Sequence, residues 1–555
     1  MADAAIGSAP TAVAGRTKAV IMVAVLLVLF LSSLDQTVVG TALPRIVTDL
    51  KGTNLYTWVV TAYLLTSTVT VPVYGKLSDA YGRKPMLLFG VVVFLCGSAL
   101  SGLSQTMPEL IGFRALQGIG AGALFPVSLA IIGDLFTPRE RGRYQGLFGA
   151  VFGISFIIGP FLGGVLTDDV SWRWVFYVNL PVGILALAVI AAVLPSLGRR
   201  AASIRDLDFL GIIVFTIGVV PLLIGLTDKG EADSSGRLYG WTSWEVGGLI
   251  IFGLIALVVF VVIESRAREP IVPLDLFRNR TYAATMVAVL LLGFGMFAAV
   301  IYMPRFYQVV RGVDATRSGY EIWTLLVGLM GGSILAGQLI SRFGRYKVLL
   351  AVSMVFLGVG AFLLLHLTAS TSNPVLWSWL LILGLGLGPG MAGYTVVVQA
   401  AVPVSRMGVA TSTLTFFRQI GGSIGLAIAG TIFNSVFIAD LPKQMEKHGV
   451  PAAVATRIAS GTQATQLSAV GNAVEAILKQ VLPAQFQPFI PGMVSGIHDA
   501  VALAIGSLSW LTLAAAVAGL LCVLLLRELP LPGGPSLRQE RTASEEKGEV
   551  PVAHF

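Results

Sequence analysis

The segment GKLSDAYGRKPML, residues Gly75–Leu87, is a short polar and basic break between two long apolar stretches. A second copy, GQLISRFGRYKVL (Gly337–Leu349), repeats its two glycines, two of its leucines and one arginine at the same spacing. The copy departs from the first at one acidic position, where Ser341 stands in place of Asp79. An internal repeat of this kind is typical of transporters whose two related halves bind the substrate between them.

The composition of the chain indicates that its solvent is lipid. Of its 555 residues 55% are hydrophobic and only 12% are charged, whereas a soluble domain carries about 25% charged residues. The apolar runs Val20–Leu34, Met86–Leu100 and Val501–Leu526 approach or reach the roughly 20 residues of a membrane-spanning helix. They lack the alternation of barrel strands, so we expect helices, which satisfy their own backbone groups.

Counting the apolar segments predicts about 14 transmembrane helices and therefore an all-α polytopic membrane protein. The expected spans are 18–42, 56–76, 86–104, 109–133, 145–167, 173–195, 209–227, 246–264, 281–307, 318–340, 347–368, 376–402, 409–436 and 500–526. An even number of spans places both termini on the same side of the membrane.

Basic residues gather in alternate loops between these spans. They are Lys76, Arg83 and Lys84; Arg139, Arg141 and Arg143; Arg199, Arg200 and Arg205; Arg266, Arg268, Arg278 and Arg280; and Arg342, Arg345 and Lys347. By the positive-inside rule these loops and both termini face the cytoplasm. The formal net charge of +8 therefore reflects membrane topology, and we expect no nucleic-acid partner.

Five motifs in order along the chain carry a family resemblance. They are Leu34–Pro44, Gly75–Pro85, Leu110–Gly122, Gly153–Leu166 and Trp172–Pro181. Together they resemble the major facilitator superfamily, and specifically its fourteen-span drug:proton antiporters, the group of the EmrB and QacA multidrug exporters. The resemblance implies the major facilitator fold, with two pseudo-symmetric six-helix halves and two additional central helices. It also implies a multi-pass protein of a bacterial inner (plasma) membrane.

This resemblance suggests a division of the chain into five parts. They are an N-terminal cytoplasmic tail (1–17), a first six-helix half (18–195), a linker with two extra helices (196–280), a second half (281–527) and a C-terminal cytoplasmic tail (528–555). The second half contains an extracellular insertion, 439–498, in which Ala453–Ser460 and Val470–Val481 resemble short amphipathic helices. The insertion either caps an outward vestibule or is a plain surface addition, which long loops tolerate at small cost.

Asp35 is the first candidate for proton coupling, because a carboxylate deep inside a span is expensive and therefore usually functional. Burial disfavours its charged form and a nearby cation favours it, so such a group is able to load and release a proton. Arg114 lies within the fourth span, cannot shed its charge, and has Asp35 as one candidate partner. The alternatives are a packing role for Asp35 and a structural clamp on backbone carbonyls for Arg114.

The first copy of the repeat predicts a latch at the cytoplasmic edge. Asp79 is placed to cap a helix N-terminus, and Arg83 to pair with Asp134 at the end of the fourth span. Such a contact would hold one conformation of a two-state element; the alternative is a loop that only sets topology. The predicted latch residues are Gly75, Asp79, Arg83, Lys84 and Asp134, and Ser341 argues against an equivalent in the second half.

The fifth span combines small residues with a proline, which allows close packing and a bend. The residues are Gly153, Gly159, Pro160, Gly163 and Gly164. By resemblance this motif is associated with antiporters, so its role is conformational.

Several polar and aromatic residues inside the spans are candidates for the substrate cavity. They are Tyr63, Gln117, Tyr394, Gln399, Phe416, Arg418 and Asn434. Arg418 needs a partner that the sequence does not identify, and aromatic residues such as Phe416 are able to stack on aromatic substrates.

The sequence contains no phosphate-binding loop of the G-x-x-x-x-G-K-[ST] type and no metal-ligand spacing among its four histidines. We therefore expect no enzyme and no cofactor, with a proton gradient as the energy source. The leading hypothesis is a monomeric, proton-coupled exporter of amphipathic or cationic drugs or toxic metabolites. The alternatives are an exporter of one endogenous lipid, siderophore or antibiotic, and a non-transporting membrane sensor that uses the outer loop.

Overall fold

The computed structural model describes residues 15–51, 55–195, 208–229, 239–267, 269–459, 475, 478–479 and 484–528. Most of the two predicted tails, the basic residues Arg199, Arg200, Arg205 and Arg268, and most of the predicted helix Val470–Val481 lie outside these described residues. The described chain is helical throughout and contains no strand, which confirms the predicted fold class.

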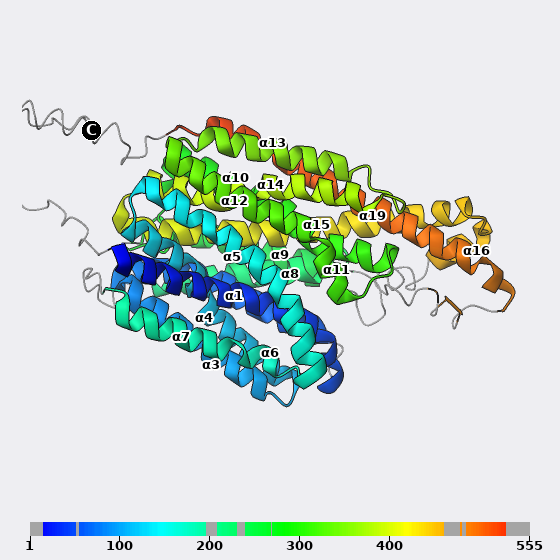
Figure 1. The fold of residues 1–555 in the computed structure, drawn as a ribbon, viewed down its shortest axis with the longest axis horizontal. Helices are drawn as coiled ribbons and strands as arrows, with labels where there is room; N and C mark the ends of the chain where they lie inside the picture. The colour runs from blue at the N-terminus through cyan, green and yellow to red at the C-terminus, as the bar shows by residue number, and fades with distance from the viewer. Residues whose placement is uncertain are drawn as a thin grey trace, which may run out of the picture.

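Long helices run side by side along one direction of the molecule (Figure 1). The first group comprises α1 (Gly15–Asp49), α2 (Tyr56–Tyr81), α3 (Arg83–Leu103), α4 (Met107–Leu135), α5 (Pro138–Val165), α6 (Trp174–Tyr177) and α7 (Asn179–Val193). Two helices follow, α8 (Phe209–Asp228) and α9 (Leu249–Glu264). The last group comprises α10 (Arg280–Val310), α11 (Ala315–Glu321), α12 (Trp323–Phe343), α13 (Lys347–Leu364), α14 (Asn373–Ala401), α15 (Met407–Lys447), α16 (Ala452–Ala459) and α19 (Ile490–Leu525).

Twelve of the predicted spans each fall on one of these helices, whereas 173–195 covers α6 and α7 and 318–340 covers α11 and α12. Within the described residues, 13 helical segments are long and apolar enough to cross a membrane. The remaining predicted span is α2, a helix of 26 residues that is less apolar because Thr, Ser and Tyr recur along it. Its packing between α4 and α15 explains this composition, since hydroxyl groups such as that of Thr66 bond to backbone carbonyls of α2 and α4.

Helix starts follow local capping chemistry. Thr137 caps the start of α5 with a capping box. Its side chain accepts from the backbone N–H of Glu140, and the Glu140 carboxylate accepts from the backbone N–H of Thr137. Pro138 fills the next position, where the missing N–H is harmless. Asn279 caps α10 by accepting from two backbone N–H groups.

Helices of the first group pack on one another, as do those of the last group. In the first group α4 packs on α2 and α3, and α1 packs on α5 and α7. In the last group α14 packs on α12 and α13, and α10 packs on α15 and α19. The two groups meet mainly along two helix pairs, α2 with α15 and α5 with α12. α14 also contacts α5, and α15 also contacts α4. We call the whole contact between the two groups the seam.

Glycines allow the backbones to touch at the seam. A Cβ on Gly75 would lie 1.9 Å from Oγ of Ser412, and one on Gly337 would lie 2.3 Å from the carbonyl oxygen of Gly142. Gly75 and Gly337 are the equivalent first residues of the two repeat copies. Both lie near the end of the bundle that carries the basic loops, which we call the basic end.

The helices α8 and α9 form a hairpin beside the seam. Phe215 of α8 contacts Phe260 of α9 and Phe416 of α15, each at 5.1 Å between ring centroids. Val69 of α2 and Ile420 of α15 belong to the same buried cluster, so the hairpin covers both sides of the seam. The apolar face of α9, including Leu254 and Val258, stays exposed, as expected of a surface in contact with lipid.

The helices on either side of the predicted insertion extend further than the sequence suggested. α15 continues past residue 436 to Lys447, and α19 begins at Ile490. With 41 residues, α15 is about 62 Å long, twice the roughly 30 Å of a hydrocarbon core. The two extensions pack together, with Nε2 of His448 2.8 Å from Oδ2 of Asp499. Figure 1 shows α19 and the short α16 projecting beyond the bundle at the right of the view, and α16 matches the first predicted short helix.

The glycine contact at the seam predicts a position-specific loss of stability on α12. Replacing Gly337→Ala forces a methyl group against the backbone of Gly142, and overpacking of this kind costs about 1–3 kcal/mol. Gly331→Ala on the same helix is the matched control, because its Cβ would meet nothing within 4 Å. Thermal unfolding in detergent should show a lower Tm for Gly337→Ala alone; equal shifts for both variants would contradict the packing described here.

Candidate functional site

Asp35 lies at the centre of a buried polar network in the first group of helices. Its carboxylate forms an ion pair with Arg114 of α4, with 2.7 Å between Oδ2 and Nη1. Its Oδ1 accepts from Nε2 of Gln117 at 2.8 Å and from Nδ2 of Asn179 at 2.9 Å. Asp35, Gln117 and Asn179 are 0% exposed and Arg114 is 1% exposed. The predicted partner of Arg114 is therefore present, and two amides complete the shell of the carboxylate.

The guanidinium of Arg114 contacts Gln117, Val59 and Tyr63 in addition to Asp35. Its Nη1 also donates to Oε1 of Gln117 at 2.7 Å, and its Nε donates to the carbonyl of Val59 at 3.3 Å. Its central carbon lies 4.2 Å from the ring centroid of Tyr63, a favourable cation–π distance. The network thus ties α1, α2, α4 and α7 together through one charge pair.

Asn179 and Ser98 belong to this network but were not among the predicted site residues. Nδ2 of Asn179 bonds to Oγ of Ser98 at 3.1 Å, and that hydroxyl donates to the carbonyl of Phe176 at 2.8 Å. The sequence signal for Asn179 is an amide side chain inside an apolar stretch, within the motif Trp172–Pro181.

At the basic end a second cluster joins the two groups of helices. Asp79 accepts from the backbone N–H groups of Gly408 and Val409, at 3.0 and 2.8 Å, at the start of α15. A carboxylate is favoured there because a helix N-terminus carries partial positive charge. Arg83 pairs with Asp79 at 2.6 Å and with Asp134 at 2.9 Å. All three charged side chains are at least nine-tenths buried.

The predicted latch residues divide in the structure. Gly75, Asp79, Arg83 and Asp134 come together beside the start of α15. Lys84 points elsewhere, donating from Nζ to the carbonyl of Ala191 on α7 at 2.7 Å, because the next residue along a helix is turned about 100° away.

The second seam pair has its own polar contacts at the basic end. Arg139 donates to the carbonyls of Ser341 and Arg342 at the end of α12. Gln399 of α14 donates to the carbonyl of Leu129 at 3.0 Å and accepts from Gln145 at 2.8 Å. The second repeat copy therefore closes against α5 through backbone carbonyls, without the acid that Ser341 replaces.

The glycines of the predicted antiporter motif face two different helices. A Cβ on Gly153 would lie 2.2 Å from Cγ of Met330 on α12. Cβ atoms on Gly159 and Gly163 would lie 2.0 and 1.9 Å from the hydroxyl oxygens of Thr37 and Thr41 on α1. Pro160 is inside α5, and Gly164 is half-buried near its end. One face of α5 therefore fits closely against α1, which carries Asp35, and another face fits closely against α12.

The predicted cavity residues lie in several places. Tyr63 and Gln117 belong to the Asp35 network, and Gln399 belongs to the seam. Tyr394 is buried in the core of the last group, and Phe416 contacts the hairpin helix α8. Asn434 is half-buried on α15. Arg418, also on α15, extends toward Phe125 of α4, with 5.8 Å between its guanidinium carbon and the ring centroid.

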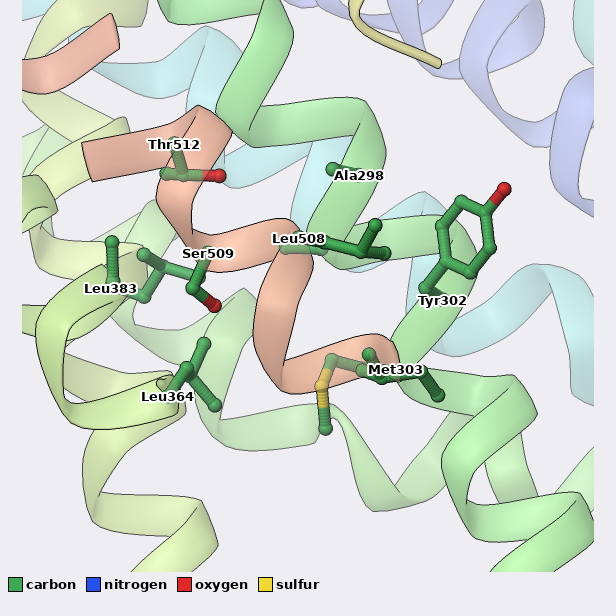
Figure 2. A pocket seen from close by; sticks show the side chains of 11 residues that line it. Ala298, Tyr302, Met303, Leu364, Leu383, Leu508, Ser509 and Thr512 are labelled. Atoms are coloured by element: carbon green, nitrogen blue, oxygen red, sulfur yellow. The ribbon is translucent and has the colours of Figure 1, made fainter. Parts of the chain in front are cut away.

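A small cavity lies inside the last group of helices, between α10, α13, α14 and α19 (Figure 2). Tyr302, Met303, Leu508, Ser509 and Thr512 are among its lining residues. Its volume of about 20 Å³ accommodates about one water molecule. This cavity is therefore too small to hold a drug-sized substrate.

Comparison with known families identifies the architecture. Residues 25–426 match the model of the Major Facilitator Superfamily. The chain belongs to the major facilitator superfamily. This is a family of transporters rather than of enzymes, so the chain is a multi-pass membrane transporter of that superfamily.

Similar curated proteins come from bacteria and from fungi. The chain is 40% identical over 418 residues to the multidrug transporter protein MdtP of Bacillus subtilis, covering 75% of this chain and 76% of the relative. It is 35% identical over 477 residues to multidrug resistance protein 3 of the same organism, covering 85% and 91%. A transporter of the acurin A biosynthesis cluster of Aspergillus aculeatus is 32% identical over 420 residues, covering 75% of each chain. The bacterial inner membrane therefore stays a prediction.

Solved structures share the major facilitator fold. The human organic anion transporter MFSD10 superposes with a TM-score of 0.58 at 16% identity, covering 92% of this chain and 99% of that one. The proton:xylose symporter XylE superposes with a TM-score of 0.54 at 14% identity, covering 84% and 96%. At these identities the likeness concerns the fold alone.

The buried ion pair predicts that substitutions of Asp35 and Arg114 do not have additive effects on stability. Arg114→Gln or Asp35→Asn alone leaves the partner charge uncompensated, which costs about 3–5 kcal/mol. The double variant should recover part of this loss, because it removes both charges together. Thermal unfolding of all four proteins in detergent measures the coupling; losses that simply add would show that the two charges act independently.

The latch predicts a conformational effect of Asp79 that Lys84 does not share. Ser412 is buried against Gly75, so Ser412→Cys, with Cys96 and Cys522 replaced by serine, reports on opening of the basic end. Asp79→Asn weakens charged hydrogen bonds of about 1.5–3 kcal/mol and should raise labelling by a membrane-impermeant maleimide in inside-out vesicles. Lys84→Gln is the matched control and should leave labelling unchanged. Equal labelling in both backgrounds would exclude Asp79 as the closing contact.

Proposed function

We propose that this chain is a proton-coupled exporter of amphipathic and cationic drugs or toxic metabolites that works by alternating access. The observation that carries this proposal is the fully buried carboxylate of Asp35, paired with Arg114 inside the first group of helices. The similarity to two multidrug proteins of Bacillus subtilis supports the class of substrate.

The proton would act by changing the network around Asp35. The ionised carboxylate accepts from Arg114, Gln117 and Asn179, which occupy three of its roughly four lone-pair sites. A proton that binds there weakens these hydrogen bonds, because it removes the negative charge that strengthens them. Loss of the negative charge also leaves Arg114 without its counter-ion. Since these residues join α1, α4 and α7, protonation would change how these helices pack, and the change would reach the seam through α5.

The closed basic end supports alternating access. Asp79 and Arg83 join the two groups of helices at α15, and Arg139 and Gln399 join them across α5, α12 and α14. With the basic loops in the cytoplasm, as the positive-inside rule predicts, this arrangement is closed toward the cytoplasm. We further propose that α1–α7 and α10–α19 are the halves that move, that the protein works as a monomer, and that no cofactor takes part.

A second candidate function is export of one dedicated endogenous substrate. The relative in Aspergillus aculeatus is named as a transporter of a biosynthesis cluster, and its similarity covers the same share of the chain as that of MdtP. A substrate screen separates the two functions, because a dedicated exporter should move one compound and leave unrelated cations behind.

The deciding experiment is transport of ethidium into proteoliposomes driven by a pH gradient. Wild type should accumulate ethidium only with the gradient, and Asp35→Asn should lose this dependence because it has no group to carry the proton. Asp35→Glu keeps a carboxylate and should keep coupling, which separates proton chemistry from folding defects. A coupled Asp35→Asn protein would place the proton site elsewhere, and an inactive wild type would remove the broad-drug proposal.

A further inference from the structure

Arg418 is a buried cation with no carboxylate partner among the described residues. Its side chain is 6% exposed, and its Nε and Nη2 are buried without a hydrogen-bond partner in the described part of the chain. No ion pair among the described residues includes it. By contrast Arg83 and Arg114 each have a carboxylate within 3 Å. Two guanidinium donors are therefore available to a ligand.

The position of Arg418 is that of a substrate site. α15 begins at Met407, so Arg418 lies about 16 Å into the helix at 1.5 Å per residue, which is about half of a 30 Å hydrocarbon core. Its guanidinium reaches Phe125 of α4 and so bridges the first and last groups of helices. Transporters of this architecture bind substrates near the midplane, between their halves.

The surroundings of Arg418 are aromatic. Phe125 contacts Phe148 and Phe152 of α5, at 6.1 and 5.8 Å between ring centroids. Phe125 and Phe152 are only half-buried, so their rings are available for stacking. The face of Phe125 attracts the cation, but it accepts none of the in-plane N–H groups. A ligand that satisfies them must bring an oxygen acceptor.

We propose that Arg418 binds the acidic group of amphipathic aromatic substrates, while the rings of Phe125 and Phe152 hold their apolar part. The planar guanidinium suits a carboxylate or sulfonate, because it offers parallel N–H donors to two oxygens. This inference rests on the proposed exporter function and extends its substrates from cations to amphipathic compounds that also carry an anionic group, such as zwitterions.

This anion subsite is separate from the proton site. Phe125 lies about 16 Å further along α4 than Arg114 at 1.5 Å per residue, and Arg114 is already paired with Asp35. A substrate anion at Arg418 therefore does not compete directly with Asp35 for its partner. Coupling between the two subsites has to pass through the packing of α4 against its neighbours.

The test compares binding of two probes of the same size, 1-pyrenesulfonate and the uncharged 1-pyrenesulfonamide. Energy transfer from tryptophan to pyrene reports the Kd of each probe for the purified full-length protein in detergent. Wild type should bind the sulfonate more tightly than the sulfonamide. Arg418→Met should lower the ratio of the sulfonamide Kd to the sulfonate Kd by about tenfold or more, because the loss of one charged hydrogen bond weakens binding by about this factor. Arg266→Met is the matched control, because Arg266 is exposed and distant from the seam helices in the chain, and it should leave the ratio unchanged.

A second variant protects the test from a folding defect. Arg418→Lys keeps the charge but loses the planar fork, so it should still prefer the sulfonate while binding it several-fold more weakly than wild type. A ratio that stays the same in Arg418→Met, or an equal loss of both probes, would overturn the anion site. Because binding needs no pH gradient, this result is independent of the ethidium experiment, and each proposal is able to fail alone.

Discussion

The low polarity of the bilayer is the constraint on which this structure depends, because each charge inside the helical bundle must find a partner. Arg114 is matched by Asp35 in the first group of helices, and Arg83 is matched by Asp79 and Asp134 at the basic end. These pairs hold together helices that are far apart in the sequence. Arg418 departs from this rule among the described residues, and it does so between the two groups of helices, where its guanidinium reaches Phe125 of α4.

The two charge clusters differ in what they join. The Asp35 network lies within one group of helices, whereas the contacts of Asp79 and Gln399 cross the seam. A change at Asp35 therefore needs a mechanical path to the seam, and α5 supplies one. Gly159 and Gly163 fit against α1, which carries Asp35, and Gly153 fits against α12. Backbones in such close contact transmit small displacements, because close-packed interiors do not absorb them locally.

The hairpin of α8 and α9 adds a lateral element to this arrangement. In the described part of the chain α8 contacts the bundle through α2 and α15, and Phe215 reaches Phe416, two residues before Arg418 in the chain. Any separation of α2 from α15 must therefore slide or tilt α8. The hairpin covers the α2–α15 side of the seam, and α9 presents the apolar outer face.

The sequence by itself determined the membrane setting, the approximate number and place of the spans, the family, and the presence of an acid at Asp35 and a cation at Arg114 inside two of the spans. These follow from hydropathy, motif order and the cost of charge in lipid, all of which are local in the chain. Tertiary structure alone decided that Asn179 and Ser98 complete the Asp35 network, that Gln399 belongs to the seam, that Lys84 lies apart from Asp79 and Arg83, and that two donors of Arg418 have no acceptor in the described part of the chain. Each of these depends on which helix faces each side chain, and helix rotation and neighbours are set by packing between distant segments, which hydropathy does not encode.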